Sequence, residues 1–288
     1  MLSSAFYLVA TSILPAAAAA GNPTVVWLQT DWAPHQILEG PHLGKGTFDL
    51  LLKRLAALLP QYQHQSRLIS LGRIEPHFQR SDEIICIAGS LYTEERASTR
   101  YYSLPVAIGP GFAVNYVSTS MVADYVESDL TLDINKLVQH PELIGAYQPN
   151  RYYPEMMLQA IGQQGSNLLA TEFTSELNAA ALLHSRRIDY VIEYPERMQF
   201  YQRNLAYTSD IASAALLGAS PYSVSYITCN KHPLSQQLIT EINQVLPVLW
   251  QADDFQELLF YWLDQNARQI LLPKFLELKQ QMAEKNRP

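Results

Sequence analysis

Residues 84–105 read IICIAGSLYTEERASTRYYSLP and combine an apolar strand, a turn and a helix start. The apolar run Ile84–Ala88 predicts a buried strand, and Gly89 predicts a turn after it. Thr93 is a residue type that caps helix N-termini, so Arg96 falls in the first helical turn. A cation is disfavoured there because that end of a helix carries partial positive charge. The pattern indicates that an anion binds nearby, held by backbone N–H groups and the Arg96 guanidinium.

The segments before this stretch also alternate between strands and helices. Val25–Leu28 is a short apolar run, and a helix capped by Thr47 carries apolar residues at helical spacing as far as Leu59. Arg67–Leu71 predicts the next strand, and Ile74–Arg80 predicts a weakly marked helix. Such alternation favours an α/β sheet covered by helices.

A similar order recurs after residue 140. Leu143–Tyr147 and Arg187–Ile192 predict strands, and Ser175–Ser185 predicts a helix. The strand Ser223–Cys229 then precedes two amphipathic helices, Ser235–Trp250 and Asp254–Leu263. These two helices need a sheet to cover, so we expect the chain to return to the first domain at this point.

The length of 288 residues permits about two domains. We expect the first domain to combine residues 21–107 with the return segment 219–288, and the second to span 108–218. The two crossings between the domains are expected near Ala107–Pro110 and near Leu216–Ser220.

The composition is that of a globular protein with a sizeable core. Hydrophobic residues make up 48% of the chain and charged residues 16%, with 27 acids and 20 bases giving a net charge of −7. No block of Lys and Arg is present that would follow a phosphate backbone. The composition therefore argues against nucleic-acid binding.

Residues 1–20 have the pattern of a secretory signal peptide. An apolar segment leads through Pro15 into a run of alanines, and Ala18–Ala20 forms a small-residue cleavage site. A transmembrane anchor is the alternative, but polar residues and Pro15 interrupt the roughly 20 apolar residues that spanning requires. No Lys or Arg precedes the apolar segment, which departs from the usual signal pattern. We expect export and cleavage, with a periplasmic location for the mature chain.

The two cysteines, Cys86 and Cys229, both end apolar strand-like runs. In an oxidising compartment an even count permits one disulfide, whereas two buried thiols are more usual in the cytosol. The sequence leaves both alternatives open. If the bond forms, residues near 86 and 229 share a domain.

Signatures of metal, cofactor and catalytic sites are absent from the sequence. The seven histidines show neither an i,i+4 pair nor His-x-His spacing, and no Gly-x-Ser-x-Gly or glycine-rich phosphate loop occurs. We therefore expect no metal, no cofactor and no enzymatic activity.

Several motifs, in order, resemble one family. They are DWAP at 31–34, GKGTFDLL at 44–51, GSLYTEER at 89–96 and YSLP at 102–105. Together they are similar to the periplasmic solute-binding proteins of amino-acid ABC transporters, the bacterial extracellular solute-binding protein family 3. The resemblance implies a type II fold, in which two α/β lobes are joined by a two-stranded hinge and clamp a ligand in the cleft.

The resemblance also implies roles for individual residues. Arg96 occupies the position of the arginine that binds the ligand's α-carboxylate in the family. Trp32 occupies the position of the aromatic residue that forms one side of the family's binding pocket. Ser90, Tyr92 and Thr93 supply further hydroxyl and amide groups beside them, although capping alone accounts for Thr93.

Two positions depart from the family pattern. Where the family has a Gly-Thr-Thr-like helix start, this chain has PNR at 149–151, so Arg151 offers a second cation for an additional acidic group. The family's aspartate, which holds the ligand's amino group, is replaced by Tyr194 with Glu193 one residue earlier. Adjacent residues on a strand face opposite ways, so we expect only one of these two side chains to enter the cleft.

The function expected from these observations is capture of a small carboxylate-bearing, amino-acid-like molecule for ABC-type uptake. The expected partners are that ligand and a transporter permease or membrane receptor, with the protein itself a monomer. One alternative is a periplasmic hydrolase or lyase on the same scaffold, for which Glu193 is the candidate acid or base. Another is a soluble sensory module that presents its ligand-bound state to a membrane receptor.

Overall fold

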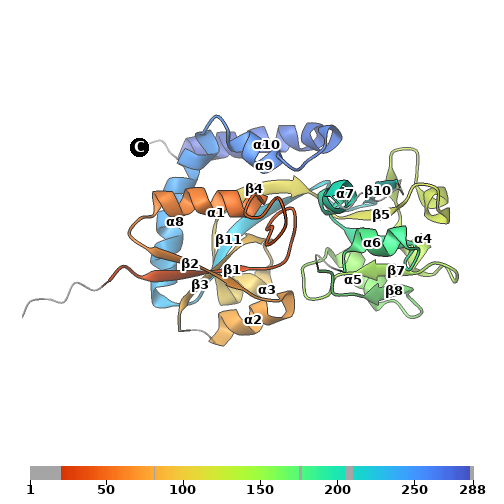
Figure 1. Cartoon of the computed structure of the whole chain (residues 1–288), viewed down its shortest axis with the longest axis horizontal. Coiled ribbons are helices and arrows are strands. Elements are labelled where there is room, and N and C mark those ends of the chain that lie inside the picture. Colours follow the sequence, from red (N-terminus) through yellow and green to blue (C-terminus); the bar gives the residue numbers. More distant parts are fainter. Residues whose placement is uncertain (1–20, 81, 175–176, 205–209, 286–288) are drawn as a thin grey trace, which may run out of the picture.

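The chain folds around two β-sheets, each covered by helices on both faces (Figure 1). The computed structural model describes residues 21–80, 82–174, 177–204 and 210–285. The predicted signal peptide at residues 1–20 lies outside the described residues. We call the two sheets, each with its helices, lobe 1 and lobe 2.

Lobe 1 contains a five-stranded sheet in the order β2-β1-β3-β11-β4. The strands are β1 (Thr24–Gln29), β2 (Gln63–Leu68), β3 (Ile84–Ser90), β4 (Arg100–Pro110) and β11 (Tyr222–Asn230). The first three are parallel, whereas β11 lies antiparallel between β3 and β4. The strand β11 therefore joins a sheet whose other four strands all lie before residue 111 in the sequence.

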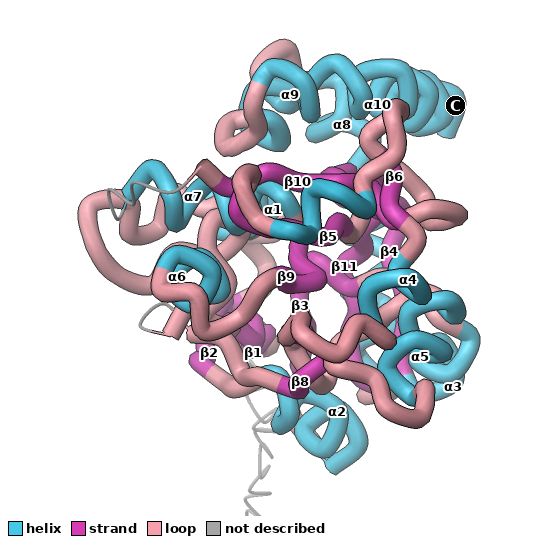
Figure 2. The backbone as a smooth tube through the Cα atoms, turned by 90° about the vertical axis from the view of Figure 1, so that its right-hand side faces the viewer, coloured by secondary structure: helices cyan, strands magenta, loops and turns pink. Residues whose placement is uncertain are grey.

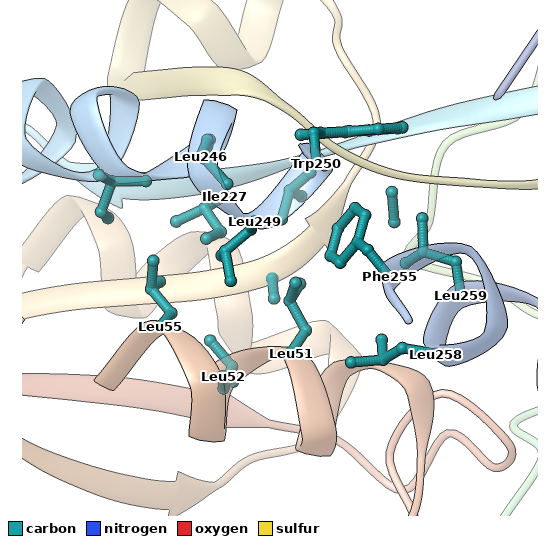
Figure 3. Close-up of a cluster of buried hydrophobic side chains, with 14 of the residues drawn as sticks. Leu51, Leu52, Leu55, Ile227, Leu246, Leu249, Trp250, Phe255, Leu258 and Leu259 are labelled. Carbon is teal, nitrogen blue, oxygen red and sulfur yellow. The ribbon is translucent and has the colours of Figure 1, made fainter. Parts of the chain in front are cut away.

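Helices cover both faces of this sheet because its inner strands β1 and β3 are apolar on both sides. The helices are α1 (Thr47–Leu58), α2 (Leu71–Arg80), α3 (Glu94–Thr99), α8 (Pro233–Gln251), α9 (Phe255–Phe260) and α10 (Gln265–Lys285). Val25 and Trp27 face the large core under α1, α8, α9 and α10, and Val26 and Leu28 face the smaller core under α2. Figure 3 shows the large core, where Leu51 of α1 lies near Phe255 and Leu55 of α1 lies near Ile227.

Lobe 2 contains a six-stranded sheet in the order β6-β10-β5-β9-β7-β8. The strands are β5 (Ala113–Val117), β6 (Thr131–Leu132), β7 (Gly145–Tyr147), β8 (Leu168–Ala170), β9 (Tyr190–Glu193) and β10 (Ile211–Leu216). The helices are a 3₁₀ turn (Met121–Tyr125), α4 (Ile134–Val138), α5 (Glu155–Gly162), α6 (Ala179–His184) and α7 (Pro195–Asn204). Figure 2 shows α4 and α5 on one side of this sheet and α6 and α7 on the other, as the two buried clusters require.

Two neighbouring segments connect the lobes. The chain leaves lobe 1 after β4 and enters β5 at Ala113, and it returns from Leu216 to β11 at Tyr222. The Gly111 N–H donates to the Pro221 carbonyl at 3.0 Å, which holds the two connections together. A Cβ atom at Gly111 would collide with the Ser220 carbonyl oxygen, so this close approach requires glycine.

Cys86 and Cys229 form a disulfide across neighbouring strands of lobe 1. They lie opposite each other in the antiparallel register of β3 and β11, and both are fully buried. The bond that the sequence left open is therefore present, and the two cysteines share a lobe.

Some element boundaries differ from the predictions. The second strand is Gln63–Leu68 rather than Arg67–Leu71, because residues from Leu71 onward begin α2. Of the helix predicted at Ser175–Ser185, residues 175 and 176 lie outside the described residues. The described helix begins at Ala179, because the Asn178 side chain caps it by accepting from the Ala181 N–H at 2.9 Å. Within the described ranges, no helix has the length and apolar character needed to cross a membrane.

Replacing both Cys86 and Cys229 with alanine is expected to lower the free energy of unfolding by about 2–5 kcal/mol. The bond joins residues 143 apart, so its loss restores considerable freedom to the unfolded chain. Urea denaturation at pH 7 measures the change, and reductant added to the wild-type protein should shift its midpoint in the same direction. An unchanged midpoint for the double variant would contradict the prediction.

Candidate functional site

A cavity of about 130 Å³ lies between the two lobes. Lobe 1 contributes Trp32 from the β1–α1 loop, Ser90 at the end of β3, and Arg96 from α3. Lobe 2 contributes Arg151 before α5 and Tyr194 after β9. The sequence-predicted residues from distant parts of the chain are thus brought to one place.

Arg96 presents a largely unpaired guanidinium group to this cavity. The Thr93 hydroxyl accepts from the Arg96 backbone N–H at 3.1 Å, which fixes the start of α3. The Arg96 side chain is 22% exposed, and its Nε lies 3.4 Å from Glu75 Oε1. Within the described residues its terminal N–H groups donate no hydrogen bond. Burial, followed by the neighbouring Arg100 cation, lowers the pKa of Arg96, but a guanidinium stays charged at neutral pH.

Glu75 and Arg100, which sequence reasoning did not identify, complete the surroundings of Arg96. Glu75 lies on α2, and its carboxylate pairs with both Arg96 and Arg100. The Arg100 guanidinium is buried and stacks over the Phe78 ring at 4.3 Å from its centre. Two cations therefore share one carboxylate, and this end of the cavity carries a net positive charge. The spacing of Arg96 and Arg100 by four residues was the available signal.

Trp32 contacts lobe 2 from the loop after β1. Its ring lies 4.9 Å from the guanidinium carbon of Arg197 and 5.7 Å from that of Arg151. The Trp32 carbonyl accepts from the N–H groups of His35 and Gln36, which folds the loop into a turn. The indole therefore makes cation–π contacts with both of these lobe 2 arginines, and Arg151 lines the cavity beside it.

Arg151 and Glu193 form a buried ion pair instead of standing free. Arg151 donates to Glu193 Oε1 at 2.7 Å, to the Ile192 carbonyl at 2.9 Å and to the Tyr153 hydroxyl at 2.8 Å. Glu193 Oε2 lies 3.3 Å from Arg197 Nε. Burial alone would raise the pKa of Glu193, but the charges of Arg151 and Arg197 outweigh it and hold that pKa below its ordinary value. The Glu193 carboxylate is therefore ionised and already paired with two cations.

The remaining predicted residues divide between the cavity and its surroundings. Ser90 lines the cavity, and its hydroxyl hydrogen-bonds to that of Thr228 at 2.8 Å. Tyr92 lies outside the lining, is 54% exposed and packs edge-on against Tyr102. Tyr194 lines the cavity, whereas Glu193, on the opposite face of the chain, does not.

Comparison of the sequence with protein-family models and with curated proteins finds no match. Solved structures do match. A substrate-binding protein of an amino acid ABC transporter from Streptococcus pneumoniae, bound to L-arginine, is 18% identical with a TM-score of 0.61, covering 84% of this chain and 94% of that one. An ancestral arginine-binding protein bound to glutamine is 17% identical with a TM-score of 0.64, covering 85% and 99%. A histidine kinase sensor domain with similarity to periplasmic binding proteins is 15% identical with a TM-score of 0.62, covering 84% and 96%.

The chain has the two-lobe fold of the periplasmic binding proteins. The fold class predicted from the sequence is therefore confirmed. In this periplasmic-binding-protein fold the cavity between the lobes is the natural place for a ligand, since both lobes contribute to its lining. Within the described residues, no three histidine, cysteine or acidic side chains are grouped closely enough to hold a metal ion.

Like Glu75, the cavity residue Glu196 was not identified from the sequence. Glu196, in the first turn of α7, lines the cavity and is 3% exposed. His35 of lobe 1 approaches it, with His35 Nε2 lying 3.4 Å from Glu196 Oε1. Only a charged residue following Pro195 marked this position in the sequence, and such a residue is ordinarily solvated at a helix start.

Replacing Glu193 with glutamine is expected to lower the free energy of unfolding by about 3–5 kcal/mol at pH 7, because it leaves Arg151 and Arg197 buried without their anion. The depressed pKa of Glu193 means that its ionic contribution is present above the ordinary value of 4.5 and lost as the pH falls through the folded-state pKa. The difference in free energy of unfolding between wild type and variant should therefore become smaller as the pH falls below 4.5.

Urea titrations across this pH range measure the gap, with Glu257→Gln as the matched control. Glu257 makes an exposed pair with Arg268, and its loss should change stability by less than about 1 kcal/mol. Equal effects of the two substitutions at pH 7 would show that the buried cluster makes no special contribution.

Proposed function

We propose that this protein is a solute-binding protein that captures a small carboxylate-bearing molecule between its two lobes. The observation that carries the proposal is the Arg96 guanidinium, which lines the cavity and donates no terminal hydrogen bond within the described residues. A carboxylate accepts two parallel hydrogen bonds from such a fork, and bonds of this charge-assisted kind are stronger than neutral ones.

The size of the cavity limits the ligand. Its volume of about 130 Å³ is close to that of an engineered apolar cavity of about 150 Å³ that holds benzene. A ligand of about six or seven non-hydrogen atoms is therefore the expected occupant. Because both lobes line the cavity, binding would hold them together and remove Arg96 from water.

The sequence analysis expected an amino-acid-like ligand, but the surroundings of Glu193 do not support a role for this residue in binding its amino group. Glu193 is paired with Arg151 and Arg197, accepts from the Tyr194 N–H at 2.8 Å, and lies outside the cavity lining. It therefore offers nothing to a ligand's α-ammonium group. Our proposal keeps the carboxylate and assigns no role in ligand binding to Glu193.

The same observations bear on the enzyme alternative. A general acid or base must reach the reacting proton, but the Glu193 carboxylate is buried between two arginines. We therefore propose binding rather than catalysis. We further propose that the protein works in the periplasm as a monomer that delivers its ligand to an ABC transporter permease. Delivery to a membrane receptor is the alternative, since a solved sensor domain has the same fold.

Replacing Arg96 with alanine is expected to weaken binding of a small carboxylate by about 2–5 kcal/mol, the usual cost of truncating one member of a buried charged pair. A thermal-shift screen of short carboxylates and amino acids identifies a probe, since a hundredfold excess over Kd adds about 2.7 kcal/mol of stability. Calorimetry then compares that probe with the wild type and Arg96→Ala.

Arg67→Ala is the matched control for this experiment. Arg67 is not among the residues that line the cavity and pairs with Glu83 on the surface, so its loss should leave the affinity unchanged. An Arg96→Ala variant that binds the probe as tightly as the wild type would remove Arg96 from the site and refute the proposal.

A further inference from the structure

Glu196 has a carboxylate oxygen that nothing in the described protein satisfies. The residue is 3% exposed and lines the cavity between the lobes. Its Oε1 lies 3.4 Å from His35 Nε2, but its Oε2 is buried without a hydrogen-bond partner among the described residues. Buried polar atoms are nearly always hydrogen-bonded, so an unsatisfied oxygen of this kind requires an explanation.

The backbone beside Glu196 carries no side chain at Gly109. Gly109 of β4 and Ser223 of β11 lie opposite each other in the strand register where the lobes join. A Cβ atom built on Gly109 would lie 3.7 Å from Glu196 Oε1 and 3.8 Å from Ser223 Oγ. Because Gly109 has no side chain, the space beside the carboxylate remains part of the cavity that these residues line.

The cavity therefore combines a cation from lobe 1 with a carboxylate from lobe 2. Arg96 pairs with Glu75 and Glu196 pairs with His35, and within the described chain no ion pair joins Arg96 to Glu196. Apolar side chains also line the cavity, and among them are Phe48, Ile108, Leu259, Trp262 and Leu263. A ligand that satisfies both charged groups needs a carboxylate and a cationic group separated by an apolar spacer.

An α-amino acid does not meet this requirement. Its ammonium group is attached to the carbon next to the carboxylate, so it would lie close to Arg96 when the carboxylate is held there. The acid nearest to Arg96 is Glu75, which already pairs with two guanidinium groups. An ammonium group at the opposite end of a short chain avoids this cationic region.

We propose that Glu196 binds the distal cationic group of the ligand, and that the ligand class is a short ω-amino carboxylate. The assignment rests on the proposed function, because it takes Arg96 as the carboxylate receptor. It adds a second recognition point on the other lobe, so that one molecule bridges Arg96 of α3 and Glu196 of α7.

Three probes with the same carbon chain test the assignment by calorimetry at pH 7. They are 4-aminobutanoate, 2-aminobutanoate and butanoate, which share a four-carbon acid chain and differ only in the position or presence of the amine. The wild-type protein is expected to bind 4-aminobutanoate roughly thirtyfold or more tightly than butanoate, the lower end of the effect of a buried charge pair. It should bind 2-aminobutanoate no more tightly than butanoate.

The variant Glu196→Gln is expected to abolish this preference. Its affinity for 4-aminobutanoate should fall to about that for butanoate, whereas its affinity for butanoate should not decrease, because the loss of an anion does not weaken binding of a carboxylate. The control Glu257→Gln removes the same charge at the surface and should leave all three affinities unchanged. The wild-type comparison requires no variant, so the test does not depend on the folding of Glu196→Gln.

The outcomes separate this inference from the proposed function. Butanoate binding that is lost in Arg96→Ala, with no advantage for 4-aminobutanoate, would refute the role of Glu196 and leave the carboxylate receptor standing. Tighter binding of 2-aminobutanoate than of 4-aminobutanoate would also refute it. Failure of all three probes to bind would overturn the ligand class, and Arg96-independent binding would overturn the proposed function itself.

Discussion

The insertion of β11 between β3 and β4 is the constraint on which the rest of the structure depends. It completes the sheet of lobe 1 with a segment more than a hundred residues later in the sequence, and it aligns Cys86 with Cys229. Because β11 also pairs with β4 as far as Pro110, both connections to lobe 2 leave the same edge of lobe 1 side by side. The close contact at Gly111 then holds these two connections together where they pass between the lobes.

In and around the cavity, four arginines and three glutamates differ in how they are paired. Arg151 and Arg197 hold Glu193, and Arg96 and Arg100 share Glu75, so each of these two clusters has one more cation than anion. Burial of so many charges is tolerated only where each has a partner. Glu196 differs from the other two acids because its only ionic partner within the described chain is a histidine. The kind of ligand that the cavity can bind therefore depends more on this difference in pairing than on the net charge of the cavity.

Local sequence signals predicted the parts of the fold that depend on local physics. The helix beginning at Thr47 was recognisable from apolar residues at helical spacing, but its N-cap is Gly46 and the predicted cap at Thr47 was wrong. Thr93 acts as the cap that its residue type indicated. The second strand was misplaced because Gln63–Leu68 is an edge strand of mostly polar residues, without the alternation that marks a half-buried strand. The long helix α10 was missed since its apolar residues do not form a single clear stripe.

The site was only partly predictable because pairing is a tertiary property. Sequence position placed Arg96, Trp32, Ser90, Arg151 and Tyr194 in the candidate site, and all five line the cavity. It could not show that Arg151 and Glu193, 42 residues apart, would neutralise each other. The strand alternation that puts Tyr194 toward the cavity puts Glu193 away from it, but which of the two faces inward depends on packing against lobe 1.

Glu196 lies on a helix that contacts the other lobe, so its position bears on how the two lobes close around a ligand. On the α7 side, Phe200 packs edge-on against Trp262, with ring centres 5.1 Å apart, and Gln199 donates to Asp264. Glu196 lies in the same helix and faces His35 of lobe 1. A ligand favours the closed arrangement only to the extent that it binds that arrangement better than the open one. A molecule held by Arg96 alone would contact lobe 1 in either state. One held also by Glu196 makes its second contact only when α7 is brought against lobe 1, so recognition of the distal group and closure of the lobes become the same event.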